Sequence, residues 1–145
     1  MEPSREEAAM LTYRALTRTA RALRRSVNAT LKEHGLTGAQ FSLLTSIPPE
    51  GIPLTQLASR SWADPGNVSG TIDRLESSGW VTRERSAEDR RVVLVFLSER
   101  GRELLAKLVP RHRKAVECAF RGLSLEQMEQ LRTLLAALNP PPEGP

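Results

Sequence analysis

Residues 79–101 combine a charged turn with two flanking apolar runs, and the charged side chains are of a kind that binds anions. Alternating apolar runs on both sides of a turn predict a β-hairpin that projects from the protein. Arg90 and Arg91 in this turn could contact phosphates, and a guanidinium gains electrostatically in a narrow minor groove. Asp89 could hold a neighbouring arginine extended. We therefore interpret the turn as a probe for nucleic acid rather than as a reaction centre.

A helix with a small, polar outer face is predicted just before this hairpin. Asp64 followed by Pro65 is a strong helix start, because Asp accepts bonds from free amide groups and Pro needs no donor there. Val68, Ile72 and Leu75 would face the core. The outer face would then consist of Gly66, Asn67, Gly70, Arg74 and Ser77. Each glycine costs about 1 kcal/mol relative to Ala in a helix, so the presence of two glycines needs a reason. Close approach of another backbone is one such reason, and a DNA groove wall would supply it.

Capping boxes predict where three other helices begin, because a Ser or Thr oxygen and a Glu or Gln three residues later exchange bonds with backbone amides. The pairs are Ser4 with Glu7, Thr37 with Gln40, and Ser124 with Gln127. The first helix is expected to end near residues 34–35 and the second before the prolines at 48–49. A short helix over residues 54–58 and a turn at 62–63 follow.

The second half of the chain should hold the hairpin and two further helices. Residues 80–85 and 91–97 are predicted as its strands, and Ser98 caps the next helix. Pro110 is expected to kink that helix. The proline-rich end, residues 140–145, is expected to form a disordered tail.

Length and composition favour one helical domain with a polyanionic partner. The chain has 145 residues, a net charge of +4 and only 4% aromatic residues, and its apolar positions are mostly Leu, Ala and Val. These features predict a mainly α fold with a small β-hairpin. No signal peptide or membrane-length apolar run is present, so we expect a cytoplasmic protein without a membrane partner.

Few residues could support other chemistry. Cys118 is the only cysteine, which excludes an intrachain disulfide and a Cys-based metal site. His34 and His112 are too isolated for a metal centre, and we expect both at the surface or at helix ends. No Ser-His-Asp or paired-carboxylate arrangement can be read from the sequence. We therefore expect neither an enzyme nor a bound metal or cofactor.

The order of short helix, turn, second helix and hairpin is that of a winged helix-turn-helix. The most specific motifs are Asp73-Arg74-Leu75-Glu76-Ser77-Ser78-Gly79-Trp80-Val81-Thr82-Arg83, Asp89-Arg90-Arg91 and Leu97-Ser98-Glu99-Arg100-Gly101. Together they resemble the MarR family of bacterial transcription regulators. The resemblance implies a homodimer that binds a pseudo-palindromic operator, most often as a repressor. It implies a winged DNA-binding domain over residues 37–97 and a helical dimerisation region over residues 1–36 and 98–139.

The resemblance also assigns site residues by position. In the recognition helix they are Pro65, Gly66, Asn67, Ser69, Gly70 and Arg74. In the wing, Asp89 would orient Arg91 into the minor groove, and Arg90 would contact a phosphate. Direct base readout would depend mainly on Asn67, which can pair with adenine at two points, so we predict largely indirect selectivity. Release by a small anionic or phenolic effector is implied too, but no motif marks its pocket.

Two other classes of function stay open. The chain could be a helical protein-interaction module with a winged fold that does not bind DNA, although the arginine wing speaks against this. It could be a thiol-dependent redox protein, although we expect Cys118 to be a buried structural thiol. The first helix also carries an arginine stripe, which we interpret as a solvated face or as a site for an anion or a partner. The stripe consists of Arg14, Arg18, Arg21 and Arg25.

Overall fold

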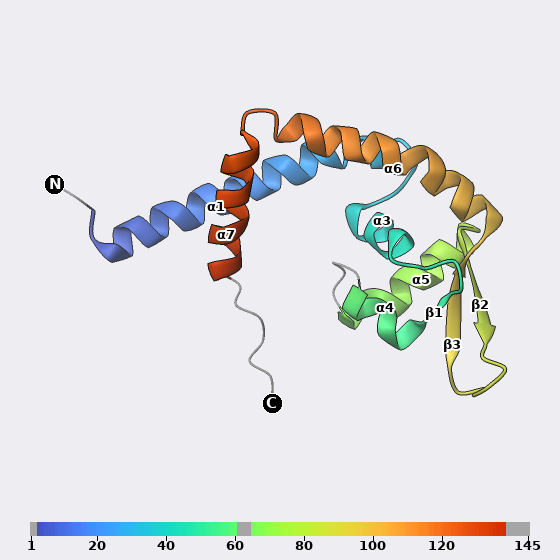
Figure 1. Cartoon of the computed structure of the whole chain (residues 1–145). Coiled ribbons are helices and arrows are strands. Elements are labelled where there is room, and N and C mark those ends of the chain that lie inside the picture. The colour runs from blue at the N-terminus through green and yellow to red at the C-terminus, as the bar shows by residue number, and fades with distance from the viewer. Residues whose placement is uncertain (1–2, 61–64, 139–145) are drawn as a thin grey trace.

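Helices form most of the protein, and the computed structural model describes residues 3–60 and 65–138. Figure 1 shows a long helical arm, formed by the helices of residues 5–32 and 99–138, attached to a lobe that holds the shorter helices and the sheet between residues 38 and 97. The elements are α1 (Arg5–Val27), α2 (Ala29–Lys32), α3 (Gly38–Thr45), β1 (Ile52–Pro53), α4 (Leu54–Arg60), the 3-10 turn η1 (Pro65–Asn67), α5 (Val68–Ser77), β2 (Val81–Arg85), β3 (Val93–Leu97), α6 (Glu99–Ala119) and α7 (Leu125–Leu138).

The three predicted capping boxes are confirmed by reciprocal hydrogen bonds. They lie at Ser4 with Glu7, Thr37 with Gln40, and Ser124 with Gln127. In each, the N–H of the Glu or Gln donates to the hydroxyl oxygen at 3.1–3.2 Å. The N–H of the Ser or Thr donates back to the Glu or Gln side chain at 2.8–2.9 Å. Each box thus satisfies two amide groups that a helix end leaves unpaired.

The first helix is shorter than predicted. It ends at Val27, and Asn28 leaves helical geometry with φ −87° and ψ 0° before α2 begins. The prediction of one helix to residues 34–35 is therefore wrong. Leu31 and Leu36 are 0% and 2% exposed, so the break turns both leucines into the core. Tertiary burial here overrides the helical periodicity of the sequence.

The helix predicted just before the hairpin starts later than expected. The residues from Pro65 form the 3-10 turn η1, and α-helical geometry begins only at Val68, whereas we predicted a start at residues 64–65. The predicted cap at Asp64 and the predicted turn at residues 62–63 lie outside the described residues. The predicted core-facing residues of α5, Val68, Ile72 and Leu75, are buried, and Thr71 is buried beside them.

The hairpin belongs to a three-stranded antiparallel sheet with the order β1-β3-β2. β2 pairs with β3 from Val81 opposite Leu97 to Arg85 opposite Val93. β1 pairs with the other edge of β3 through Ile52 and its neighbour. The sequence does not predict β1, because two residues are too few to show an alternating pattern.

Ser98 joins the sheet to α6. Its hydroxyl oxygen accepts the N–H of Gly101 at 2.9 Å, which is the predicted cap, and donates to the carbonyl oxygen of Gly79 at 2.6 Å. Gly79 ends α5 as predicted, with a φ of 76° that favours glycine. α6 then runs through Pro110 as one helix.

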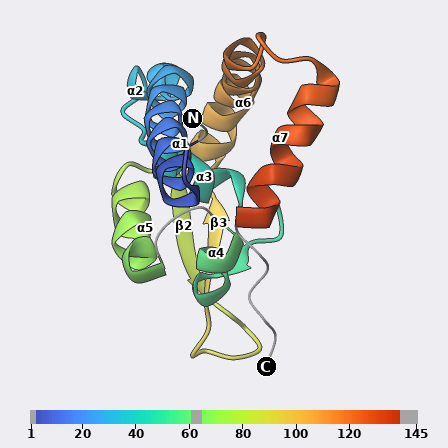
Figure 2. The same ribbon diagram turned by 90° about the vertical axis from the view of Figure 1, so that its left-hand side faces the viewer.

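The hydrophobic core lies in the lobe and reaches the arm through α2 and α6. Its fully buried residues include Leu31, Leu43, Leu44, Leu57, Ile72, Leu75, Val95 and Leu108. α1 and α7 contribute no buried residue, and they carry the exposed apolar side chains Met10, Leu11, Tyr13, Leu16, Leu125, Leu134 and Leu138. Figure 2 shows α1, α6 and α7 together in the arm. In the described part of the chain, no helix is both long and apolar enough to cross a membrane.

Candidate nucleic-acid interface

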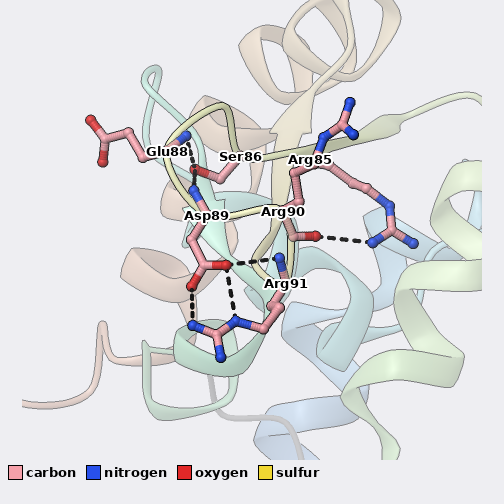
Figure 3. Close-up of polar contacts among 6 residues, drawn as sticks. All are labelled: Arg85, Ser86, Glu88, Asp89, Arg90 and Arg91. Atoms are coloured by element: carbon pink, nitrogen blue, oxygen red, sulfur yellow. Dashed lines mark hydrogen bonds and ion pairs between the residues drawn. The ribbon is translucent and has the colours of Figure 1, made fainter.

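Asp89 and Arg91 form a bidentate ion pair at the tip of the β2–β3 hairpin (Figure 3). Arg91 Nε donates to Asp89 Oδ1 at 3.1 Å, and Nη2 donates to Oδ2 at 3.2 Å. The Arg91 backbone N–H also donates to Oδ1, at 3.0 Å. The side-chain and then the backbone hydrogen bonds from Arg91 hold the pKa of the Asp89 carboxyl below its ordinary value. The Arg91 side chain is still 92% exposed, so its guanidinium is held in place and open to solvent.

Further hydrogen bonds order the rest of the tip (Figure 3). Ser86 Oγ accepts the N–H groups of Glu88 and Asp89 at 3.2 and 3.4 Å. Arg85 Nη1 donates to the carbonyl oxygen of Arg90 at 2.9 Å, while the Arg90 side chain is exposed. Arg90 lies in the loop as predicted, and Arg91 lies there too, because β3 begins at Val93 rather than at residue 91. A loop ordered before binding loses less conformational entropy when it contacts a partner.

The structure places the other predicted site residues on η1 and α5. Pro65 opens η1; Gly66, Asn67, Ser69 and Arg74 are exposed, and Gly70 is partly exposed. Among the described residues, a β-carbon on Gly70 would meet only Asn67 Oδ1, at 3.3 Å. The described residues therefore do not require glycine at this position. This surface leaves room for the close approach of another molecule.

Sequence reasoning missed Arg83, which joins β2 to α5. Its Nη2 atom forms an ion pair with Asp73 and donates to the carbonyl oxygen of Ser69 at 3.4 Å. Its Nε atom lies 3.7 Å from Glu76 Oε2. The signal in the sequence was the alternation of side chains along a strand, which puts Arg83 on the same face of β2 as buried Val81. An arginine on a core-facing strand position needs acidic partners nearby.

A largely apolar groove of about 880 Å³ lies between α1, α6 and α7. Its walls include Leu16, Leu23, Phe120, Met128, Leu131 and Leu135. Several of the apolar residues of the arm are strongly exposed, and Leu125 reaches 85%. The single chain thus leaves an apolar surface uncovered along its arm, which is typical of an interaction site.

Cys118 is exposed on α6, so the prediction of a buried thiol is wrong. Its apolar neighbours Val116 and Ala119 are half-buried, whereas Cys118 lies beside the exposed Glu117. Because successive helical residues point in directions about 100° apart, apolar neighbours in the sequence do not place a residue on the apolar face.

A second cavity, of about 570 Å³, lies where α1 meets the lobe. Arg24 of α1, Arg60 at the end of α4 and His112 of α6 line it. The His112 ring lies 4.6 Å from that of Phe41 between centroids, and desolvation lowers the pKa of the imidazole. His112 is thus half-buried in mid-helix rather than at the surface or a helix end. No acidic side chain is found among the described residues that line the cavity, which suits an anion.

Other candidate chemistry is not assembled in the described residues. His34 lies in the turn after α2, and no three His, Cys, Asp or Glu side chains in the described ranges are grouped as a metal site. The stripe residues Arg14, Arg18, Arg21 and Arg25 are all exposed on α1, as a solvated face would be.

A short helix, a second helix with a small polar face and a hairpin with an arginine tip define a winged helix-turn-helix DNA-binding protein. The chain belongs to the MarR family of transcriptional regulators, and residues 36–93 match the model of that family. It is therefore a regulator and not an enzyme.

Known proteins resemble the chain along nearly its whole length. YkoM of Bacillus subtilis, an uncharacterized HTH-type transcriptional regulator, is 35% identical over 130 residues, which cover 89% of this chain and 84% of YkoM. The crystal structure of Sco3205, a MarR family regulator from Streptomyces coelicolor in complex with DNA, matches with a TM-score of 0.84 and 27% identity, covering 99% of this chain and 94% of Sco3205. BpsR of Bordetella bronchiseptica, whose DNA binding is regulated by 6-hydroxynicotinic acid, matches with a TM-score of 0.76 and 26% identity, covering 89% and 98%.

Proposed function

We propose that the chain is a homodimeric repressor that binds a pseudo-palindromic operator in a sequence-specific manner. The observation that carries this proposal is the exposed, preordered Asp89–Arg91 pair at a projecting tip. A narrow minor groove has enhanced negative potential, so a guanidinium already held extended by one carboxylate gains there at little entropic cost. In this proposal Arg91 enters the minor groove, Asp89 orients it and Arg90 contacts a phosphate.

The recognition helix would enter the major groove with its small polar face. The proposed contact residues are Pro65, Gly66, Asn67, Ser69, Gly70 and Arg74. Asn67 could form a two-point pair with adenine, and Ser69 could add one contact. With few long side chains on this face, much of the selectivity would come from groove shape and from the wing.

Dimerisation would use the helical arm, formed by residues 1–36 and 98–139, while residues 37–97 bind DNA. The apolar groove between α1, α6 and α7 supports this assignment, because the arm helices of a second copy offer the apolar surface needed to fill it. Two recognition helices related by a two-fold axis would read half-sites about 10 bp apart. A protein that binds such an operator would act in the cytoplasm.

A small anionic or phenolic effector would release the DNA. The cavity near Arg24, Arg60 and His112 supports this part of the proposal, because it joins the arm to the winged lobe and gathers positive charge. BpsR, which responds to 6-hydroxynicotinic acid, has a similar fold. An effector can weaken DNA binding only if it binds the arrangement that is incompetent for DNA more tightly.

Selection of bound sequences from random DNA by the purified protein tests the proposal. Recovery of an inverted repeat with half-sites about one helical turn apart would support it. Affinity should also fall steeply with salt, because each dimer neutralises several phosphates. Absence of enrichment over non-specific binding would contradict the proposal and favour a winged interaction module that does not bind DNA.

A further inference from the structure

One face of β2 connects three parts of the winged lobe. Side chains alternate across a strand, so Val81, Arg83 and Arg85 share a face. Val81 is 1% exposed and belongs to the core. Arg83 reaches α5, and Arg85 reaches the hairpin loop, where it donates to the carbonyl oxygen of Arg90. This face therefore contacts the core, the recognition helix and the wing in succession.

We infer that Arg83 is a positioning residue for DNA binding: it fixes α5 against the sheet and neutralises two carboxylates without contacting DNA itself. The inference rests on the proposed recognition of an operator by α5. The guanidinium holds the carboxylate of Asp73, the carbonyl oxygen of Ser69 and, at 3.7 Å, the carboxylate of Glu76. These three points span about two turns of the helix, so one side chain sets both its position and its rotation.

The charges of α5 show why this pairing matters for DNA. Within α5, Asp73 and Glu76 outnumber the one cation, Arg74. Both carboxylates are partly open to solvent, with side chains 61% and 44% exposed, so phosphates near the helix would be repelled by them. Arg83 brings the local charge to zero. Its own side chain is only 24% exposed, which keeps it from reaching a phosphate as the tip residue Arg91 can.

The test separates discrimination from overall affinity. Discrimination is the Kd for an unrelated duplex divided by the Kd for the selected operator. Arg83→Met keeps the aliphatic length and removes the charge, and a triple variant adds Asp73→Asn and Glu76→Gln. Arg111→Met is the matched control, because Arg111 also forms an ion pair with a glutamate, Glu33 at 3.2 Å, but on the arm. Circular dichroism identifies a temperature at which every variant is folded.

Arg83→Met should lower discrimination about tenfold, the size of one lost base-pair preference. It should leave the slope of log Kd against log salt unchanged, because no phosphate contact is removed. The triple variant should regain affinity for both duplexes, since the repulsion is gone, but should not regain discrimination. Arg111→Met should preserve affinity and discrimination.

Other results would overturn the inference. A slope reduced by about one, with equal losses on both duplexes, would make Arg83 a phosphate contact. A triple variant with restored discrimination would show that charge alone matters and positioning does not. If the unaltered protein selects an operator and Arg83→Met keeps its discrimination, only this inference fails. If the unaltered protein selects no sequence, the proposed function itself fails.

Discussion

Gly101 lies so close to Trp80 that a β-carbon on the glycine would be 2.0 Å from the Trp80 carbonyl oxygen. The same oxygen accepts the N–H of Ser98 at 3.1 Å. The first turn of α6 therefore rests directly on the backbone at the start of the hairpin. The helical arm and the wing meet here without a side chain between them.

Gly101→Ala should lower the free energy of unfolding by about 1–3 kcal/mol, because the methyl group forces backbone to move in a packed junction. Urea denaturation followed by circular dichroism measures the change. Gly122→Ala is the matched control, since a β-carbon at Gly122 would have no neighbour within 4 Å in the described part of the chain. Equal effects of the two substitutions would show that the junction can relax.

Arg91→Ala should weaken operator binding by about 1–3 kcal/mol, and Arg90→Ala by less. The physical reason is that Arg91, which Asp89 holds in place, would enter the minor groove, whereas Arg90 would supply one phosphate contact. Fluorescence anisotropy titrations over a range of salt concentrations measure both effects. Equal losses for the two variants at all salt concentrations would contradict these separate roles.

Stability should fall as the pH drops below about 6.5, because burial lowers the pKa of His112 in the folded chain. Between the unfolded value near 6.5 and the lower folded value, the unfolded chain binds more protons than the folded chain. Below the folded pKa this group causes no further loss. Urea midpoints from pH 8 to about pH 5 should show the decline.

The variant His112→Gln should reduce that decline, and His34→Gln, a matched change in the turn after α2, should keep it because His112 is untouched. An unchanged pH dependence in His112→Gln would assign the effect to other groups. An NMR titration of the His112 ring checks the direction of the shift independently.

The local signals in the sequence predicted the elements of the fold better than their limits. Capping boxes and the buried face of α5 depend on residues three or four apart, so they are readable without tertiary structure. The break at Asn28 and the strand pairing of Ile52 depend on burial and on contacts distant in sequence. No local pattern contains that information.

The site was predictable to a similar degree. The Asp89–Arg91 pair joins residues two apart in one loop, so its chemistry could be read from the sequence. The partners of Arg83 lie on another element and become neighbours only when β2 packs on α5. The cavity near Arg24 and His112 likewise gathers residues from separate helices.

Leu134→Asp should dissociate the proposed dimer, with an increase in its dissociation constant of about tenfold or more, because a charge would be buried in the interface. The Leu134 side chain is 67% exposed in the single chain, so the substitution should spare the fold of the subunit. Analytical ultracentrifugation measures the association. Ala136→Asp adds the same charge on another face of α7 and serves as the control.

Arg24→Met should weaken binding of an aromatic carboxylate by about tenfold, the loss expected for one charged hydrogen bond. The probe would come from a thermal-shift screen of aromatic carboxylates and phenols, and isothermal titration calorimetry would measure its affinity. Arg25→Met removes a neighbouring charge that does not line the cavity. Equal affinities for the two variants would argue against the cavity as the effector site.

The alternation along β2 determines which changes of length the hairpin can accept. One residue inserted between Val81 and Arg83 would turn Arg83 and Arg85 to the opposite face of the sheet and leave Asp73 without its arginine. An insertion within residues 86–91 would leave Val81, Arg83 and Arg85 on the same face of β2. The hairpin can therefore change in reach by single residues at its loop, while its strands can lengthen only in steps of two without separating Arg83 from α5.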